Sequence, residues 1–384
     1  MPLDLVFQLA GTCNEYPWGK MGSDSLAAKL CEKTPNTGFQ IDPKKNYSEM
    51  WFEDYPDFPA RKLDSGELLA DVLQRDRDRL LGKKVVTQFD SQLPYLPKIL
   101  SIAKALPLQI HPNKELASKL QEKDPESFTD DNHKPEIAIA LSKFEVFAGF
   151  KPLNEVALLF KLEPLKRFNP EGSEKWTNET LRNVTRNLLN LDLDTVKSIQ
   201  ANLSNLSEGD LAMQHQYIPE DAGSLVTLLC MNFMVFQPGD AIFIPANGIH
   251  AYLSGDIVEC MARSNNVLNI GFCPPADRNN VDTFSNTLTF KAHSKEDVIL
   301  PSRKCDKSKL GKTVVYKPPM SEGENEEITA SEGPGVMIVT SGKGVLRVNG
   351  QEFQLLEGFI FFIAPGVDIR LESKETLQAY MAVI

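Results

Sequence analysis

Four side chains of types that bind transition metals fall in three separate segments of the chain. Gln109 and His111 are two residues apart in a short apolar run, so a strand would direct both side chains to one face. Glu136 directly precedes the apolar run 137–141, and His250 follows a segment rich in glycine and proline. An amide oxygen, two imidazoles and a carboxylate form a set that suits zinc and leaves a position for water or substrate.

Each of these residues also has an ordinary structural interpretation. A single histidine such as His111 or His250 is commonly satisfied by its neighbours, and a carboxylate such as Glu136 beside a strand is commonly solvated. It is their joint occurrence on β-like segments that favours a metal site. The remaining histidines have weaker cases: His133, His215 and His293.

Zones of different composition would position these residues. Residues 1–152 and 229–300 contain short apolar runs punctuated by glycine and proline, which predict strands of one catalytic domain. Residues 153–228 carry leucine at helical intervals, which predicts an inserted helical domain. Residues 301–384 contain evenly spaced short strands, which predict a C-terminal jelly roll. The fold class is therefore mainly β, with an inserted α-helical part.

Several elements can be located within these zones. Helices are predicted over Ser65–Leu81, Lys114–Lys123 and Asn178–Leu191 from their apolar periodicity, and a further one over 207–216. A hairpin turn is predicted around Asn349, where an Asn-Gly pair joins two apolar runs.

Composition restricts the classes of protein. The net charge of −11 and the pI of about 5.1 argue against a nucleic-acid partner, which would need a basic face. The chain has no stretch that predicts a signal peptide or a membrane span, and its 6 cysteines lack CxxC spacing. We therefore expect a cytoplasmic protein with reduced thiols, no membrane association and, in the absence of heptads, a monomeric state. An anionic substrate would need a local basic pocket.

Six motifs follow one another along most of the chain. They are YPWGK at 16–20, SEMW at 48–51, LPKILS at 96–101, QIHPNKELA at 109–117, NHKPE at 132–136 and NGIHAYLSGDIVECMA at 247–262. The segment 239–251 is also similar to the second motif of cupins. In this order the motifs closely resemble those of the type I mannose-6-phosphate isomerase (phosphomannose isomerase) family, which belongs to the cupin superfamily.

This resemblance implies a zinc enzyme built from cupin, or jelly-roll, barrels with an inserted helical domain. It implies one Zn²⁺ per chain, with ligands at Gln109, His111, Glu136 and His250. The implied substrate is a sugar phosphate, because the family interconverts mannose 6-phosphate and fructose 6-phosphate by proton transfer through an enediol. The implied setting is carbohydrate metabolism and GDP-mannose biosynthesis.

Three further residues match active-site positions of the family: Lys98, Lys134 and Glu259. Lys134 would stabilise a developing oxyanion. Glu259 would carry the proton or, alternatively, orient its neighbours.

The chain departs from the family on the substrate side. Asn269 stands where the family keeps a catalytic arginine, and Pro275 replaces a lysine. Two smaller departures are Asn265 in place of an aspartate and Pro107 in place of a serine. Losing two charge-assisted hydrogen bonds of roughly 1.5–3 kcal/mol each would weaken binding or rate about 10²–10⁴-fold. Nearby Arg263 and Arg278 would supply a substitute cation, unless they are ordinary surface arginines.

Three functions therefore remain open. The first is a zinc-dependent aldose–ketose isomerase of mannose 6-phosphate. The second is a divergent zinc cupin that acts on a different substrate, which need not be phosphorylated, as Asn269 and Pro275 suggest. The third is a non-catalytic zinc-binding cupin.

Overall fold

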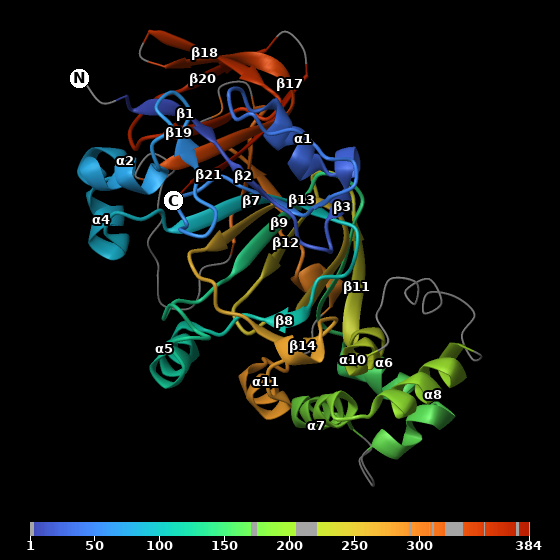
Figure 1. Cartoon of the computed structure of the whole chain (residues 1–384). Helices are drawn as coiled ribbons and strands as arrows, with labels where there is room; N and C mark the ends of the chain where they lie inside the picture. Colours follow the sequence, from blue (N-terminus) through green and yellow to red (C-terminus); the bar gives the residue numbers. More distant parts are fainter. Residues whose placement is uncertain are drawn as a thin grey trace. The chain divides into compact units, whose positions relative to one another are not determined.

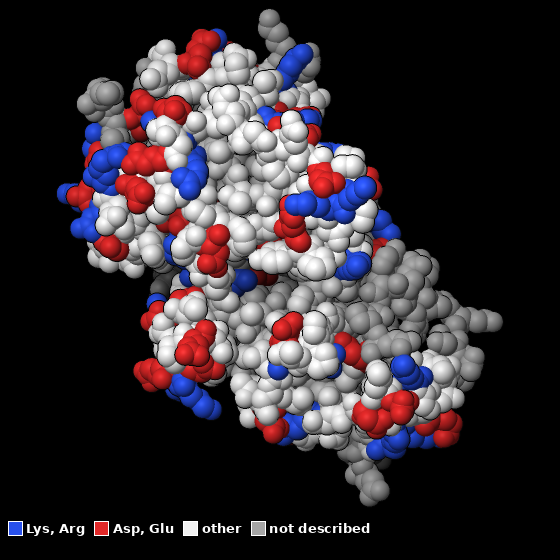
Figure 2. Space-filling view, viewed as in Figure 1, with Lys and Arg blue, Asp and Glu red and all other residues white. Residues whose placement is uncertain are grey.

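The structure is a computed structural model. It describes residues 4–169, 175–204, 221–291, 294–306, 308, 311–318, 333–348, 350–373 and 376–383. The predicted helix at 207–216, the turn residue Asn349, and His215 and His293 lie outside these ranges. Within them, no helix is both long enough and apolar enough to cross a membrane. On the face drawn in Figure 2, basic and acidic side chains are interspersed, so the net charge does not form one continuous acidic surface there.

The chain folds into two compact units, each made of separate stretches of sequence. Unit 1 comprises Met1–Ser101, Asp256–Arg263 and Pro319–Ile384, and unit 2 comprises Ile102–Gly255 and Ser264–Pro318. The sequence predicts a different set of domains, and it stays a prediction: 1–152 with 229–300, 153–228, and 301–384.

Unit 1 contains a seven-stranded antiparallel sheet that joins the two ends of the sequence (Figure 1). Its strands are β1 (Val6–Ala10), β6 (Arg61–Lys62), β17 (Gly335–Val348), β18 (Gln351–Leu356), β19 (Ile360–Ile363), β20 (Arg370–Glu372) and β21 (Leu377–Val383). β1 pairs with β19, where Phe7 lies opposite Phe362. One apolar core runs through this part and includes Val6, Leu346 and Phe361.

A second ladder of unit 1 carries the predicted residue Lys98. It consists of β2 (Thr12–Asn14), β5 (Glu49–Trp51) and β7 (Tyr95–Ile102). Trp51 lies opposite Lys98 in the pairing of β5 with β7, so both side chains leave the same face. The other elements of the unit are β3 (Lys20–Met21), β4 (Asn46–Tyr47), α1 (Leu26–Lys33), α2 (Leu69–Arg75), α3 (Arg77–Leu80) and α4 (Lys83–Phe89).

Unit 2 is built on antiparallel strands that carry the predicted metal ligands. The strands are β8 (Leu108–Ile110), β9 (Glu136–Ala140), β10 (Phe144–Phe150), β11 (Met231–Phe236), β12 (Ala241–Ile244), β13 (His250–Ala262) and β14 (Leu268–Gly271). β8 pairs with β13 and with β14, while β9 pairs with β12. From Asp256 onward, β13 belongs to unit 1. A short hairpin, β15 (Ser302–Lys304) with β16 (Val314–Tyr316), completes the strands of unit 2.

Helices gather at one end of unit 2 (Figure 1). They are α6 (Leu153–Leu159), α7 (Asn178–Leu189), α8 (Leu193–Ser204), α10 (Ala222–Cys230) and α11 (Val281–Thr287). Helix α10 is wholly buried and contacts α6, α7 and α8. Its Leu225 shares one core with Leu188 of α7 and Phe147 of the sheet.

The predicted helices are largely present, with one correction. Helix α5 spans Lys114–Lys123 as predicted, because the Asn113 side chain accepts a hydrogen bond from the Leu116 N–H and caps the first turn. The prediction of one helix over Ser65–Leu81 is wrong. That stretch begins its helix only at Leu69 and divides into α2 and α3, because Asp76 adopts a non-helical backbone with φ −141° and ψ 51°.

Candidate metal centre

One cross-strand row in unit 2 brings three of the relevant residues together. His250 on β13 lies opposite Gln109 on β8, and Asn269 on β14 lies opposite Gln109 from the other side. Residues that face each other on neighbouring strands project to the same side of the sheet. Gln109, His250 and Asn269, the residue that stands where the family keeps an arginine, therefore share one face.

A turn holds the His111 segment next to the His250 segment. Asn247 adopts a left-handed backbone with φ 60°, a conformation that asparagine tolerates better than most residues. Its backbone N–H donates to the carbonyl of His111 at 2.6 Å, and its side-chain Oδ1 accepts from the N–H of Asn113 at 2.9 Å. The two histidine rings consequently lie with their centroids 5.2 Å apart.

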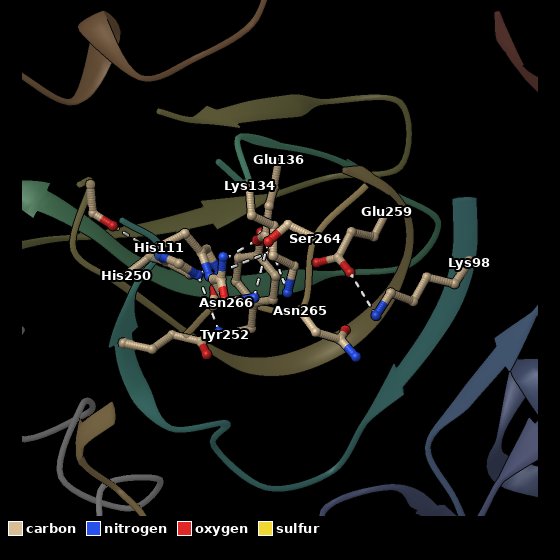
Figure 3. A network of polar contacts seen from close by, with 12 residues as sticks. Lys98, His111, Lys134, Glu136, His250, Tyr252, Glu259, Ser264, Asn265 and Asn266 are labelled. Atoms are coloured by element: carbon tan, nitrogen blue, oxygen red, sulfur yellow. Dashed lines mark hydrogen bonds and ion pairs between the residues drawn. The ribbon is translucent and has the colours of Figure 1, made fainter. Parts of the chain in front are cut away.

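Glu136 completes a buried cluster with the two histidines (Figure 3). Its Oε1 lies 3.1 Å from Nε2 of His111, and its Oε2 lies 3.5 Å from Nε2 of His250. One ligand atom from each residue falls within 4.8 Å of the others, and all three side chains are buried. This is the only His, Cys, Asp or Glu cluster of metal-binding geometry among the described residues.

Backbone carbonyls fix the tautomer of both imidazoles. Nδ1 of His111 lies 2.7 Å from the carbonyl oxygen of Asn266, and Nδ1 of His250 lies 3.1 Å from that of Gly248. A carbonyl oxygen can only accept, so each Nδ1 carries the proton and each Nε2 presents a lone pair towards Glu136. This is the usual arrangement of a metal-binding histidine.

The cluster is electrostatically incomplete without a cation. Nε2 of His111 is buried and makes no hydrogen bond of suitable geometry with any described residue, even though the Glu136 carboxylate is adjacent. Two lone pairs and a carboxylate that face one another repel unless a proton or a metal ion lies between them. A divalent ion fits this donor set, which combines two imidazole nitrogens with carboxylate oxygen.

The pKa values of the three groups favour their metal-binding forms. Burial lowers the pKa of His111, with a further contribution from Lys134, and burial lowers the pKa of His250 to about 4. Burial alone would raise the pKa of Glu136, but His111 and Lys134 outweigh it, so that this pKa lies well below its ordinary value. Neutral imidazoles and an ionised carboxylate are therefore present at neutral pH, as metal binding requires.

Gln109 is adjacent to this cluster, with its amide Nε2 3.2 Å from Nε2 of His250. To act as a ligand, the amide must turn so that Oε1 replaces Nε2, an exchange that leaves the shape of the group almost unchanged. Lys134 places Nζ 3.4 Å from Oε1 of Glu136, as predicted for a cation beside the site.

Tyr252 and Asn266 are parts of the site to which the sequence analysis assigned no role. The Tyr252 hydroxyl donates to Oε2 of Glu136 at 3.2 Å. Its position two residues beyond His250 on a strand is the signal that points to it, because such residues share a face. No comparable local signal points to Asn266, which acts through its backbone carbonyl.

Lys98 and Glu259 belong to unit 1, where they form a buried cluster (Figure 3). Nζ of Lys98 lies 3.5 Å from Oε2 of Glu259 and 3.8 Å from Oε1 of Glu49. It also lies 4.4 Å from the centre of the Trp51 ring, within range of a cation–π contact. The lysine is thus surrounded by two carboxylates and an aromatic face.

The four residues that differ from the family's pattern can be located in the fold. Pro275 is exposed in a short 3₁₀ turn, and Pro107 directly precedes β8. The backbone N–H of Asn265 donates to Asp130 at 2.9 Å. Asn269 is half-buried, and its Oδ1 is buried without a hydrogen-bond partner among the described residues.

The two arginines considered as substitute cations already have acidic partners. Arg263 pairs with Asp54 at 2.5 Å and lies over the ring of Tyr55. Arg278 pairs with Asp221 at 3.3 Å and also donates to the carbonyl of Cys273. Neither arginine is a simple surface residue, because each guanidinium joins two segments of its own unit.

The fold and the cluster together define a class: a mainly antiparallel β protein of the cupin type with a histidine- and carboxylate-based metal centre. Solved structures share this fold across the whole chain. A phosphomannose isomerase variant from Salmonella typhimurium aligns with a TM-score of 0.82 at 22% identity, covering 99% of this chain and 100% of that one. A mannose 6-phosphate isomerase solved with zinc bound aligns with a TM-score of 0.80, also at 22% identity and with the same coverage.

Sequence comparison gives the family. Residues 6–153 match the model of the phosphomannose isomerase type I catalytic domain. The mannose-6-phosphate isomerase of Saccharomyces cerevisiae is 33% identical over 99% of this chain and 98% of its own length. That of Schizosaccharomyces pombe is 31% identical over 98% and 99%. The chain belongs to the mannose-6-phosphate isomerase family, so the resemblance and the mainly β, cupin-type fold predicted from the sequence are confirmed.

Proposed function

We propose that this chain is a zinc-dependent aldose–ketose isomerase that interconverts mannose 6-phosphate and fructose 6-phosphate. The buried cluster of His111, Glu136 and His250 carries the proposal, because its donors face one another and need a cation. Relatives that carry the activity in their names match 98% and 99% of the chain, and two fold neighbours were solved with zinc. We assign one zinc ion per chain, held by these three residues and by Gln109 after its amide turns.

A zinc ion bound there would supply a Lewis acid for the substrate carbonyl. The reaction itself moves one proton between C2 and C1 of the sugar through an enediol, so no external oxidant or reductant is needed. We propose that the Lys134 ammonium group stabilises the oxygen on which negative charge develops, since it already lies against the Glu136 carboxylate. Lys98 and Glu259 are proposed as further catalytic positions on the family resemblance, with Glu259 as the proton carrier.

The decisive experiment measures zinc content and turnover on the same purified protein. We expect one zinc per chain, and conversion of mannose 6-phosphate that disappears on chelation and returns with added zinc. Glu259→Gln and Lys134→Met should lower kcat while zinc stays bound. A fully zinc-loaded protein that converts none of a panel of phosphorylated and plain sugars would instead identify a non-catalytic zinc cupin.

A second function, isomerisation of a different and unphosphorylated sugar, is favoured by one observation. Oδ1 of Asn269 is buried without a hydrogen-bond partner among the described residues, on the face that carries Gln109 and His250. A neutral acceptor there suits a hydroxyl better than a phosphate. The same panel separates the two functions, since turnover of mannose but not of mannose 6-phosphate would support the second. Asn269→Arg combined with Pro275→Lys should then shift preference towards the phosphorylated sugar.

A further inference from the structure

Two loops of unit 2 are joined by hydrogen bonds next to the metal centre. The segment Asp130–Asn132 leads directly into the strand that begins with Glu136. The segment Ser264–Asn266 ends with the carbonyl that accepts the Nδ1 proton of His111. The position of Glu136 and the hydrogen bond of His111 therefore both depend on how these two loops are joined.

The Asn266 side chain joins them through a single nitrogen. Its Nδ2 lies 2.7 Å from the backbone oxygen of Asp130, 3.0 Å from Oδ1 of Asp130 and 3.0 Å from the backbone oxygen of Asn132. Turning the amide would place Oδ1 against these three acceptors, so the orientation is fixed. Oδ1 is left buried without a partner among the described residues, and Asn266 is 1% exposed. A buried acceptor is thus left unsatisfied so that the nitrogen can hold the loops together.

The Asp130 carboxylate joins the same loops from the other side. Its Oδ1 accepts from the backbone N–H of Asn132 at 3.0 Å, and its Oδ2 accepts from the backbone N–H of Asn265 at 2.9 Å. Hydrogen bonds to an ionised acceptor are stronger than those between neutral groups. The backbone immediately before the Asn266 carbonyl is therefore anchored by a charge.

We propose that Asp130 and Asn266 are positioning residues of the metal centre. They hold the Asn266 carbonyl where it keeps the proton of His111 on Nδ1, and they hold that carbonyl at a fixed distance from the loop that delivers Glu136. Neither residue is one of the metal ligands proposed above. The inference rests on the proposed metal centre, and it states where that centre obtains its preorganisation.

The test compares two neighbouring aspartates. Asp130→Asn and Asp131→Asn each remove one negative charge, but the exposed Asp131 side chain takes no part in these contacts. The zinc dissociation constant of each variant is measured by competition with a colorimetric chelator. We expect Asp130→Asn and Asn266→Ala to weaken zinc binding about 10- to 100-fold, and Asp131→Asn to bind as the wild type does.

A second measurement separates positioning from general stability. In metal-free protein labelled with ¹⁵N-histidine, His111 should be protonated on Nδ1 in the wild type and in Asp131→Asn, and should show a mixture of tautomers in Asp130→Asn. Urea unfolding of the same samples verifies that the proteins are folded. Equal zinc affinity in the Asp130 and Asp131 variants would overturn the inference while leaving the metal centre intact. A wild-type protein that binds no zinc would overturn the metal centre itself.

Discussion

The metal centre of unit 2 and the Lys98 cluster of unit 1 bury charged and titratable groups in opposite ways. At the metal centre, the His111 and His250 lone pairs face the Glu136 carboxylate, and Nε2 of His111 has no hydrogen-bond partner among the described residues. In the other cluster, Lys98 lies between the Glu49 and Glu259 carboxylates and over the Trp51 ring. The first arrangement needs a cation from outside the chain, whereas the second already contains one. Burial of ionisable groups therefore does not by itself show whether a cluster needs a cation from outside the chain.

The two units also differ in how their buried acids and bases respond to pH. Glu53 of unit 1 is fully buried and accepts a hydrogen bond from the Tyr55 N–H at 2.6 Å. Burial raises the pKa of Glu53 to about 8, with that hydrogen bond opposing it. Burial lowers the pKa of His250 in unit 2 to about 4. In both cases the folded protein favours the neutral form, but the resulting pH dependences have opposite signs.

The largest effect is expected from removing a metal ligand. Mutating a residue that only orients a ligand weakens metal binding about 10- to 100-fold. Removing a ligand itself, as in His111→Ala and Glu136→Gln, should therefore weaken zinc binding more than about 100-fold and leave the protein free of zinc after dialysis. Elemental analysis measures the zinc content, and His133→Ala is the matched histidine control. Full zinc in His111→Ala would show that the ion binds elsewhere.

The next largest effect is expected on stability, from removing the cation of the Lys98 cluster. Lys98→Met leaves two carboxylates buried without their cation and should lower the free energy of unfolding by about 3–5 kcal/mol, while zinc content stays at the wild-type level. Adding Glu259→Gln should recover part of the loss, because one uncompensated charge is then removed. Urea unfolding measures both variants.

An exposed lysine provides the control for Lys98→Met. Lys119 pairs with Glu115 at 2.6 Å on the surface of α5, and Lys119→Met should leave stability unchanged, because exposed ion pairs contribute little. Equal losses in the two lysine variants would contradict the contrast between a buried and an exposed pair. Loss of zinc from Lys98→Met would contradict the prediction that the lysine affects stability and not the zinc content.

Glu53 gives the pH-dependent prediction for unit 1. Its pKa rises from about 4.5 in the unfolded chain to about 8 in the folded one, so the folded state holds the extra proton between these values and stability falls as pH rises through that range. Glu53→Gln should therefore stabilise the protein at pH 8 by on the order of 4 kcal/mol and change little near pH 4.5. Urea unfolding at both pH values provides the measurement, and a gain that is the same at both would refute the assignment.

The histidines give the prediction with the opposite sign in unit 2. With a folded pKa of about 4 for His250 and an unfolded value of 6.5, the unfolded state binds the extra proton between them, so stability falls as pH falls. Metal-free protein should lose on the order of 2 kcal/mol between pH 7 and pH 5, and His250→Gln should flatten this slope. A wild-type slope unchanged by His250→Gln would place the titrating group elsewhere.

Much of the local structure and the chemistry of the site follow from the sequence. The bounds of α5 follow from its apolar spacing and the Asn113 cap, and the start of α7 follows from its leucine periodicity. The spacing of Gln109 and His111 on a short apolar run predicts that both side chains serve one site, although β8 ends at Ile110 and His111 lies directly beyond it. These features depend on residues a few positions apart, so their backbone preferences and periodicity are visible in one stretch of chain. The break at Asp76 was missed because nothing in the apolar pattern of that stretch marks it.

Other properties depend on partners that are far apart in sequence, and only the tertiary structure decided them. Examples are the pairing of β1 with β19, the ion pair of Arg263 with Asp54, and the hydrogen bonds from Asn266 to Asp130. The tautomer of His111 also depends on a distant segment, because it is set by the position of the Asn266 backbone carbonyl. The sequence determined which donors the metal centre has. The fold determined how they are oriented, because hydrogen-bond direction and burial exist only after distant segments have packed together.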